Sequence, residues 1–283
     1  MSERLRADAD TTLLALLKQK LEGWSGSRIK SRLKAGCVLV NGEAVTHHAH
    51  PLTSGDDVEV LAATQAAKHK EGGLPIVYSD KELVGVNKPP GLVSVSPGDD
   101  YERTALTVMT EYLSRPGVPQ QLWAVHRVDR DTSGVILFAK SKAARDGVMA
   151  IWGEVRRTYL VIVDGGPNQD KGRIDMPMRM DERGFRALVG RLPGAQEAVT
   201  EYRVLRRGSK RTLLDVRIST AHQHQIRAHL AWLGCPVSGD GRYGQDGFRL
   251  ALHSHTLTLP TPDGRGQLVM EAPMPKAFEN MLR

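Results

Sequence analysis

The stretch from His126 to Lys140 constrains the fold more than any other part of the sequence. It reads HRVDRDTSGVILFAK, so a charged loop runs directly into five apolar residues, VILFA. The apolar run predicts a buried strand, and the polar Thr132, Ser133 and Gly134 before it predict a turn. Loops of this kind, mounted on a rigid scaffold, are where proteins tend to carry reactive groups. The stretch is therefore the first candidate for a functional site.

Asp129 is the candidate reactive group in this loop. It lies between Arg127 and Arg130 and is followed by a second acid, Asp131. Nearby positive charge favours the ionised form of a carboxyl group, so we expect Asp129 to be a carboxylate at neutral pH. That state suits a nucleophile or a base rather than a general acid. A surface cluster of salt bridges also explains these residues, so the stretch alone leaves both interpretations open.

The length and the charge of the chain restrict the classes of protein to consider. With 283 residues the chain can bury a sizeable core, and we expect two domains. Its net charge of +7 and its pI near 9.5 suggest an anionic partner. Nucleic acid is the commonest such partner, although a need for solubility would explain the charge as well.

Cysteine usage and apolar segments exclude several other classes. Cys37 and Cys235 are too few and too far apart for a disulfide framework or a four-thiolate zinc site. The sequence has no apolar run of about 18 residues and no signal-peptide pattern. We therefore expect a cytoplasmic protein without a membrane partner.

The N-terminal part reads as a small basic module. Leucines at helical spacing predict a first helix capped by Asp10 and Thr11, and RIKSRLKAG predicts a second one that ends at Gly36. The segment CVLVNGEAV predicts two strands joined by a tight Asn-Gly turn, and SGDDVEVLA predicts a further turn and strand. The second helix carries four positive side chains, which are Arg28, Lys30, Arg32 and Lys34.

This order of elements resembles the S-four-like RNA-binding domain, also called the alpha-L motif. The resemblance is carried by two segments, SRIKSRLKAGCVLVNGEAV and GDDVEV. It implies that residues 1–62 bind RNA and that the basic helix contacts phosphates. The alternative is an amphipathic helix whose charges only face solvent. The family often opens with an Arg-Leu-Asp triplet, where this chain has ADADTT, so the RNA contacts of the first helix stay open.

A linker and a larger domain are predicted after this module. Residues 63–73, ATQAAKHKEGG, are small and polar and show neither helical nor strand periodicity, as in a hinge. In residues 74–283, short strands alternate with helical segments and turns. The segment IVYSDKELVGVNKPPGLVSVS predicts two strands around a rigid turn from Lys88 to Gly91.

Six segments of the larger domain together resemble the RluA-type pseudouridine synthases. They occur in the order of that family and read NKPPGLVSV, HRVDRDTSGVILFAKS, RRTYLVIVDG, AVTEYRVL, HQIRAHLAWLGCPVSGDGRYG and ALHSHTLTLPTP. An S-four-like domain in front of them is common in the family. The resemblance implies an α+β fold with a mixed, mostly antiparallel sheet and flanking helices, behind a small N-terminal alpha-L RNA-binding domain. It also implies an active cleft across the middle of the sheet.

The resemblance further implies an activity, the isomerisation of uridines in structured RNA to pseudouridine. It places the essential aspartate of the family at Asp129, which either attacks the sugar or removes a proton from it. Arg227, in HQIR, matches the arginine that pairs with this aspartate from a different loop. Tyr159 matches a tyrosine that lies against the target base. Arg127 matches an arginine that enters the RNA helix where the uridine flips out.

Neither a cofactor nor a metal is implied, because the isomerisation transfers no electrons or groups to another molecule. Without the surrounding motifs, Arg227 would equally suit a structural ion pair, and Tyr159 would suit a core position. The chain departs from the family before HQIR, where Ala221 and His222 replace a glycine and an arginine. We therefore expect the RNA contacts of this loop to be altered while the aspartate and its arginine persist.

Three alternatives remain beside this interpretation. The pairs His222/His224 and His253/His255 each have the spacing of one strand face, as a zinc site would need. The family has no metal role there, which argues against zinc. Large-subunit ribosomal RNA is the expected substrate, because family members with the front module usually modify it, and transfer RNA is the alternative. A non-catalytic RNA-binding protein of this fold, such as a ribosome assembly factor, is the third possibility. We expect a monomer that does not bind DNA.

Overall fold

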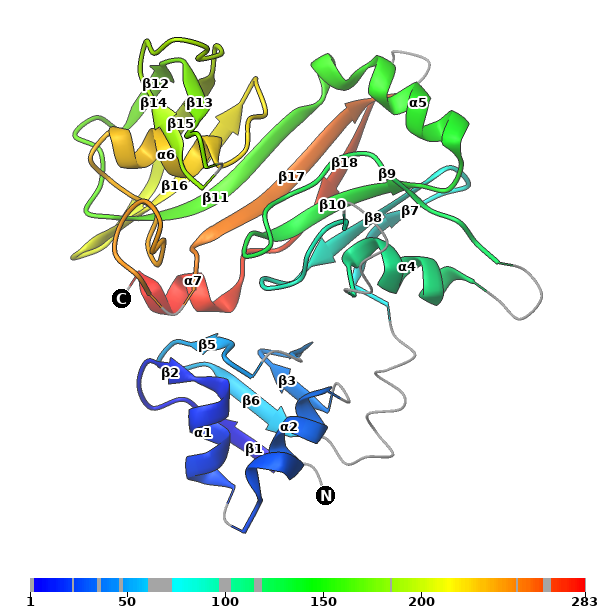
Figure 1. Cartoon of the computed structure of the whole chain (residues 1–283), viewed down its shortest axis with the longest axis vertical. Helices are drawn as coiled ribbons and strands as arrows, with labels where there is room; N and C mark the ends of the chain where they lie inside the picture. Colours follow the sequence, from blue (N-terminus) through cyan, green and yellow to red (C-terminus); the bar gives the residue numbers. More distant parts are fainter. Residues whose placement is uncertain are drawn as a thin grey trace.

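Two separate sheets, each with its own hydrophobic core, organise the chain in the computed structural model (Figure 1). The structure describes residues 3–21, 23–34, 37–45, 48–60, 73–96, 103–114, 119–183, 185–247, 249–261 and 266–282. The predicted linker therefore lies outside the described residues, apart from Gly73. Within the described part of the chain, no helix is long and apolar enough to cross a bilayer.

The N-terminal part is a small α+β unit around a four-stranded antiparallel sheet. Its elements are β1 (Glu3–Arg6), β2 (Thr11–Thr12), α1 (Leu13–Lys20), α2 (Gly26–Lys34), β3 (Val38–Val40), β4 (Glu43–Ala44), β5 (Pro51–Leu52) and β6 (Asp57–Val60). The sheet has the strand order β1-β6-β3-β4. Leu13 and Leu17 of α1 pack with Ile29 and Leu33 of α2 in one core, so the apolar face of each helix is buried.

The hairpin predicted from Asn41 and Gly42 is confirmed. The two residues have φ angles of 53° and 85°, the left-handed pair that a type I′ turn requires, and they join β3 to β4. The strand predicted from GDDVEV is also confirmed as β6. The helix cap predicted at Gly36 lies outside the described residues.

The first helix begins later than predicted. Its N-cap is Thr12, whose hydroxyl accepts a hydrogen bond from the Ala15 N–H at 3.4 Å. Thr11 instead belongs to β2, which pairs with β5. The prediction of Asp10 and Thr11 as caps was wrong, because Thr11 pairs with Leu52 in a short strand and the helix is capped by Thr12.

The larger part is built on a ten-stranded sheet. Its strands are β7 (Ile76–Ser79), β8 (Leu83–Lys88), β9 (Trp123–Ala124), β10 (Ser133–Ala139), β11 (Arg156–Asp164), β12 (Lys171–Asp175), β15 (Val199–Arg207), β16 (Arg211–Ile218), β17 (Leu252–Pro260) and β18 (Gln267–Glu271). The main order is β12-β15-β16-β11-β17-β10-β8-β7, with β18 beside β17 and β9 beside β10. Of the pairs between these described strands, β10 with β17 is parallel and the others are antiparallel. The predicted mixed, mostly antiparallel sheet is confirmed.

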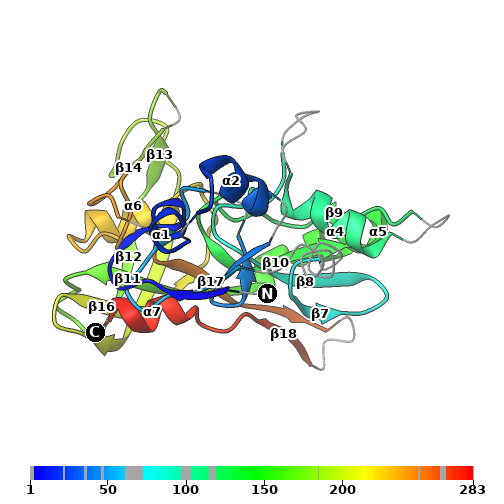
Figure 2. The ribbon, with the colours of Figure 1, turned by 90° about the horizontal axis from the view of Figure 1, so that it is seen from below.

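Helices flank this sheet, as the predicted α+β class requires. They are α4 (Ala105–Leu113), α5 (Lys142–Ala150), the short η1 (Trp152–Glu154), α6 (Gln225–Trp232) and α7 (Lys276–Met281). A hairpin of β13 (Met178–Met180) and β14 (Ala187–Val189) lies beside α6. Both Figure 1 and Figure 2 place α5 and α6 at opposite ends of the sheet.

The segment after the turn from Lys88 to Gly91 is not the strand that the sequence predicted. Both β7 and β8 precede this turn, and in the described residues 92–96 only Val93 makes a bridge, to Thr104. The carbonyl of Leu92 accepts a hydrogen bond from the Lys88 ammonium at 2.8 Å. The main chain here is therefore bound by a buried side chain rather than by a neighbouring strand.

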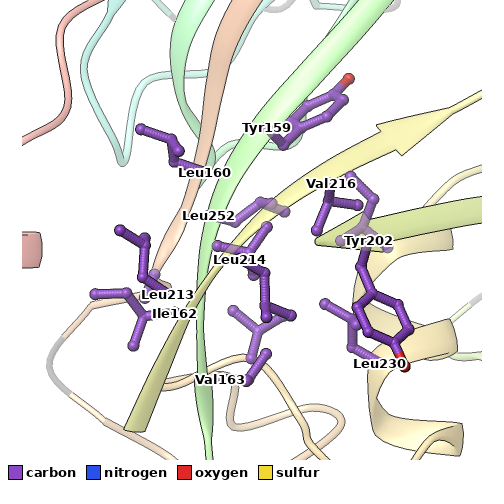
Figure 3. Packing of buried hydrophobic residues seen from close by; sticks show 14 of the residues in the cluster. Tyr159, Leu160, Ile162, Val163, Tyr202, Leu213, Leu214, Val216, Leu230 and Leu252 are labelled. Atoms are coloured by element: carbon purple, nitrogen blue, oxygen red, sulfur yellow. The ribbon is translucent and has the colours of Figure 1, made fainter. Parts of the chain in front are cut away.

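The largest core cluster packs against both faces of β11, β16 and β17 (Figure 3). Leu230 of α6 and Phe278 of α7 both belong to it. β11 is buried without interruption from Tyr159 to Val163, because the sheet is covered on both faces at this position. In Figure 3 the hydroxyl of Tyr159 points away from the other labelled side chains of the cluster. The core thus holds the ring of Tyr159 and leaves its polar end outside.

Gly134 allows β10 to approach β17 closely at the point where the Asp129 loop enters the sheet. It pairs with Ser254 and has a φ of +106°. A Cβ atom at this position would collide with the main-chain oxygen of Ser254. A larger residue would therefore have to separate the two strands and move the loop.

We predict that Gly134→Ala lowers the free energy of unfolding by more than about 2 kcal/mol, because it combines backbone strain with an overlap of main-chain atoms. Urea unfolding at pH 7 would measure the loss. Gly147→Ala in α5 is the matched control, since its Cβ would meet no atom within 4 Å. The control should gain roughly 0.5–1 kcal/mol from better helix propensity. Equal stability of the two variants would contradict the role given to Gly134.

Candidate active site

The loop that carries Asp129 is held by the segment after the Lys88–Gly91 turn. Ser94 Oγ donates to the carbonyl of Val128 at 2.6 Å and accepts from the Val128 N–H at 3.2 Å. The N–H of Gly91 donates to the carbonyl of Arg130 at 2.9 Å, and Arg130 Nε donates back to the Gly91 carbonyl at 3.2 Å. These bonds fix the main chain on both sides of Asp129.

Lys88 strengthens the same connection from inside the protein. Its side chain is fully buried, and Nζ donates to three carbonyl oxygens, those of Pro89, Leu92 and Arg130, at 2.8–3.0 Å. Burial lowers the pKa of Lys88 to about 7, while attraction to Asp131 and Asp129 opposes this shift. An ammonium group has three N–H donors, so the three carbonyls match its protonated form.

Arg227 reaches the site from a helix rather than from a loop, which corrects the sequence prediction. It is the third residue of α6, in the first turn after the N-cap residue His224. His224 has a φ of 60°, in the left-handed region that is unfavourable for residues other than glycine. Strained residues of this kind concentrate at functional sites, where the surrounding structure maintains them.

The guanidinium of Arg227 is shared by two carboxylates. Nε and Nη2 donate to the two oxygens of Asp240 at 2.6 and 2.7 Å, and Nη1 donates to Asp129 at 3.2 Å. The side chain of Asp240 is 0% exposed, and that of Asp129 is 30% exposed. Burial opposes the charge of Arg227, but its hydrogen bonds and its attraction to both acids outweigh burial and raise its pKa. The buried acid therefore orients the arginine, and the arginine orients Asp129.

His224 also lies near the Asp129 carboxylate, beside the same oxygen that Arg227 contacts. Its Nε2 is 3.8 Å from Asp129 Oδ2, and its Nδ1 is 3.0 Å from the hydroxyl of Tyr243. The Tyr243 oxygen also accepts the N–H of Ala187 at 2.6 Å. Burial lowers the pKa of His224, and attraction to Asp129 only partly opposes this.

Tyr159 lies on β11 with 8% of its surface exposed. Burial raises the pKa of its phenol to about 12; Arg157 opposes this shift and Asp129 adds to it. Among the described residues, the Tyr159 hydroxyl has no hydrogen-bond partner. It is therefore a neutral phenol whose polar end is available to a molecule in the site.

One cavity of about 450 Å³ unites the four predicted residues of the catalytic region. Asp129, Tyr159, Arg227 and Arg127 all line it, although they come from a loop, a strand and a helix far apart in the sequence. Arg127 is exposed and makes no ion pair within the described part of the chain. The grouping makes a surface salt-bridge cluster an insufficient explanation of Asp129, because its arginine partner comes from α6 and its side chain is only 12% exposed.

The basic residues predicted to bind RNA in α2 do not line this cavity. Arg28 and Lys30 are exposed, and the Arg28 guanidinium lies 3.9 Å from the ring centroid of Trp24. Arg32 is half-buried, with Nη1 3.8 Å from the sulfur of Cys37, and Lys34 is the last residue of the helix. The helix presents positive charge beside an aromatic ring on the surface of the N-terminal part.

The histidines that suggested zinc each have a local partner. His222 Nε2 lies 2.8 Å from the Glu197 carbonyl, and His253 Nδ1 lies 2.8 Å from Ser133 Oγ. His255 Nδ1 lies 2.8 Å from the carbonyl of Ala272. Among the described residues, no group of three or more His, Cys, Asp or Glu side chains is placed to hold a metal ion.

The unusual residues before HQIR fit the loop without strain. Ala221 has no positive φ, so the glycine of the family pattern is not required at this position. The His222 N–H donates to Gln225 Oε1 at 3.1 Å, and Thr220 Oγ1 donates to the same oxygen at 2.9 Å. Both Ala221 and His222 line the active cavity. The departure from the pattern therefore changes the wall of the site while the start of α6 remains well bonded.

The sequence was compared with known proteins. The family model described as RNA pseudouridylate synthase matches residues 82–232, more than half of the chain. The chain belongs to the RNA pseudouridine synthase family.

Relatives and solved structures agree with this assignment. The uncharacterized RNA pseudouridine synthase YlyB of Bacillus subtilis is 30% identical over 92% of this chain and 89% of its own length. A protein of Nitrosomonas europaea named ribosomal large subunit pseudouridine synthase D is 30% identical over 94% of this chain and 82% of its own length. The structure of human RNA Pseudouridylate Synthase Domain Containing 4 is similar, with a TM-score of 0.61 and 26% identity over 74% of this chain and 91% of that one. The protein is thus an isomerase that acts on RNA, and the predicted pseudouridine synthase fold is confirmed.

Sequence reasoning missed several residues of this pseudouridine synthase site. Asp240 lies in the quoted segment GDGRYG, but nothing in its spacing indicates that it pairs with Arg227. His224 was seen only as a possible zinc ligand. Arg157 and Trp152 line the cavity as well, and Arg157 stands two residues before Tyr159, on the same face of a strand. The spacing of two residues between Arg157 and Tyr159 is the one sequence signal that could have placed Arg157 in the site.

We predict that Asp240→Asn destabilises this pseudouridine synthase by about 3 kcal/mol, because the change removes one partner of a buried bidentate ion pair. Urea unfolding at pH 7 would measure the change. Asp246→Asn is the matched control: it removes an exposed acid nearby and should change stability by less than about 0.5 kcal/mol. If Asp240→Asn unfolds like its control, Asp240 does not orient Arg227.

Proposed function

We propose that this pseudouridine synthase isomerises specific uridines of large-subunit ribosomal RNA, with Asp129 as the catalytic nucleophile or base. The observation that carries the catalytic part is the 3.2 Å contact, inside one cavity, between Asp129 and Arg227, which the buried Asp240 holds through two further hydrogen bonds. The similarity to a large-subunit enzyme of Nitrosomonas europaea over 94% of the chain supports the choice of RNA.

The chemistry needs a carboxylate held in one orientation. The bond between ribose C1′ and uracil N1 breaks, the base rotates, and a bond from C1′ to C5 replaces the first one. Asp129 either attacks C1′ or removes a proton from the sugar, and both roles require its ionised form. Arg227 fixes the direction of the Asp129 carboxylate through its hydrogen bond. The reaction balances within the nucleotide, since C5 loses a proton and N1 gains one.

Tyr159 is the residue that meets the base after its rotation. Its ring is fixed by the core, and its hydroxyl is free of protein partners among the described residues. The hydroxyl is therefore in a position to take part in the loss of the C5 proton. With its pKa near 12, Tyr159 acts through a hydrogen-bonded proton transfer rather than as a preformed phenolate.

Arg127 is the residue that opens the RNA. A uridine stacked in a helix cannot reach a carboxylate inside a cavity, so it must leave the stack at a cost of a few kcal/mol. Arg127 is exposed at the rim and has no ion-pair partner in the described chain. Inserted in the gap that the uridine leaves, its guanidinium offsets part of this cost through stacking and contacts with phosphate.

The N-terminal part supplies a further RNA-binding surface, as expected for an S-four-like domain. The charged α2 residues Arg28, Lys30, Arg32 and Lys34 are suited to phosphate contacts. A second cavity of about 960 Å³ lies between this part and the catalytic part, and Arg186, Arg242 and His50 line it. This cavity also includes Arg227, beside the acids Asp131, Asp240 and Asp246, so it connects the N-terminal part to the active site.

The chemistry and the substrate are tested together in a strain that lacks this gene. We expect that pseudouridines disappear from its large-subunit ribosomal RNA, that a gene with Asp129→Ala fails to restore them, and that one with Asp131→Ala succeeds. Pseudouridine mapping in ribosomal and transfer RNA would measure this. Loss confined to transfer RNA would support the alternative substrate. Restoration by Asp129→Ala, or no loss at any site, would contradict the catalytic role or the proposed function itself.

We predict that Arg28→Glu with Arg32→Glu weakens RNA binding and flattens its dependence on salt, because each lost phosphate contact reduces the slope of log affinity against log salt by about one. Filter binding between low and high salt would measure the slope. Arg145→Glu in α5 is the control, since it reverses an exposed arginine at one end of the catalytic sheet. An unchanged slope in the double variant would contradict an RNA-binding role of α2.

A further inference from the structure

Arg157 is a buried cation whose bonding is incomplete. Its side chain is 8% exposed, yet among the described residues its Nε has no hydrogen-bond partner and no carboxylate pairs with it. One contact to protein oxygen is recorded, from Nη2 to the carbonyl of Ser219 at 3.4 Å. A buried guanidinium in this state weakens folding unless another molecule completes its bonding.

Arg157 forms part of the wall of the active cavity. It lines that cavity together with Asp129 and Tyr159, and it lies on the same face of β11 as Tyr159. Its guanidinium carbon is 5.5 Å from the centroid of the Trp152 ring. The neighbouring His126 is not its partner, because His126 Nε2 already accepts the N–H of Leu137 at 3.1 Å.

We propose that Arg157 binds a carbonyl oxygen of the target uracil and stabilises the negative charge that the ring acquires when it leaves the ribose. This inference rests on the proposed function. When the bond from C1′ to N1 breaks, its electron pair stays on the uracil and spreads over N1, O2 and O4. A fixed guanidinium beside the ring lowers the energy of this state, and formation of the C1′–C5 bond then removes the charge.

The walls around Arg157 favour the base over a phosphate as the bound group. Trp152, Val125 and Leu252 line the same cavity and give it flat, apolar surfaces, against which a pyrimidine ring packs. An RNA phosphate remains hydrated and is better met by exposed arginines such as Arg127. A nine-tenths buried arginine that stacks beside an aromatic ring suits a flat polar group taken out of water.

The stability of a variant separates this role from a structural one. Arg157→Met keeps an unbranched stem against Trp152 and removes the incompletely bonded group. If Arg157 binds the substrate, the variant should be as stable as the parent or more stable, while its activity falls. If Arg157 only supports the fold, stability and activity should fall together. Arg156→Met, at the exposed neighbouring position on the opposite face of β11, is the matched control.

The experiment compares four proteins: the parent, Arg157→Met, Arg157→Lys and Arg156→Met. Each is assayed in single-turnover reactions on a large-subunit RNA fragment with either uridine or 5-fluorouridine at the target position. Loss of the intact target nucleoside measures bond cleavage, and urea unfolding measures stability. For Arg157→Met on uridine we expect a rate about 100-fold lower with a similar affinity for RNA. The defect should shrink to less than about tenfold on 5-fluorouridine, because fluorine itself stabilises the uracil anion. Arg157→Lys should recover part of the rate, and Arg156→Met should match the parent.

Each result decides the inference. An Arg157→Met enzyme that is as fast as the parent, or slow only because it unfolds, would overturn it. An equal defect on both target nucleosides would also overturn it, and would point to a contact with phosphate or to a positioning role. A parent enzyme that converts no uridine would instead refute the proposed function, and this outcome is visible before any variant is examined.

Discussion

The guanidinium of Arg227 is the group on which the arrangement of this site depends. Asp240 is a fully buried carboxylate, and such a charge is tolerated only when its hydrogen bonds are nearly complete. Arg227 supplies two of them, and the main-chain N–H groups of Arg242 and Tyr243 supply two more. This bonding leaves one edge of the guanidinium for Asp129. The direction of the exposed acid is therefore set by an acid that does not itself line the cavity around it.

A second cation fixes the same loop through its main chain. Lys88 binds the carbonyl of Arg130, the residue after Asp129, while Arg227 binds the side chain of Asp129 itself. The two cations arrive from different sides, one from the end of β8 and one from α6. Neither contact alone would determine both the position and the rotation of the carboxylate. Together they give the preorganisation that a catalytic group needs, since a displacement of about 1 Å is already costly to the rate.

Residue patterns were sufficient to predict individual strands and the Asn-Gly hairpin, because periodicity and turn chemistry act over short stretches. The mostly antiparallel sheet was predicted from the family resemblance instead. They were insufficient where a distant partner decides the structure. The Lys88 ammonium binds main-chain carbonyls, including that of Leu92, and the segment after Gly91 is not a strand. The sequence pattern of that segment gives no sign of this contact. The sequence prediction placed HQIR in a loop, but α6 begins at Gln225, directly after His224 in its left-handed conformation. Asp240 was invisible as a partner because its pairing with Arg227 exists only after folding.

Three arginines of the cavity differ in how the protein completes their bonding, and this difference indicates what each one meets. Arg227 donates from three nitrogens to Asp240 and Asp129, so its main role is to hold Asp129. Arg127 is exposed and hydrated, so it can bind the charged backbone without losing protein contacts. Arg157 is buried and incompletely bonded by the described residues, and a group that enters the cavity can bind it. Because solvent cannot hydrate Arg157 fully, a hydrogen bond from its guanidinium to the bound group is strongest when that group carries the most negative charge. This bond therefore stabilises that step of the reaction most.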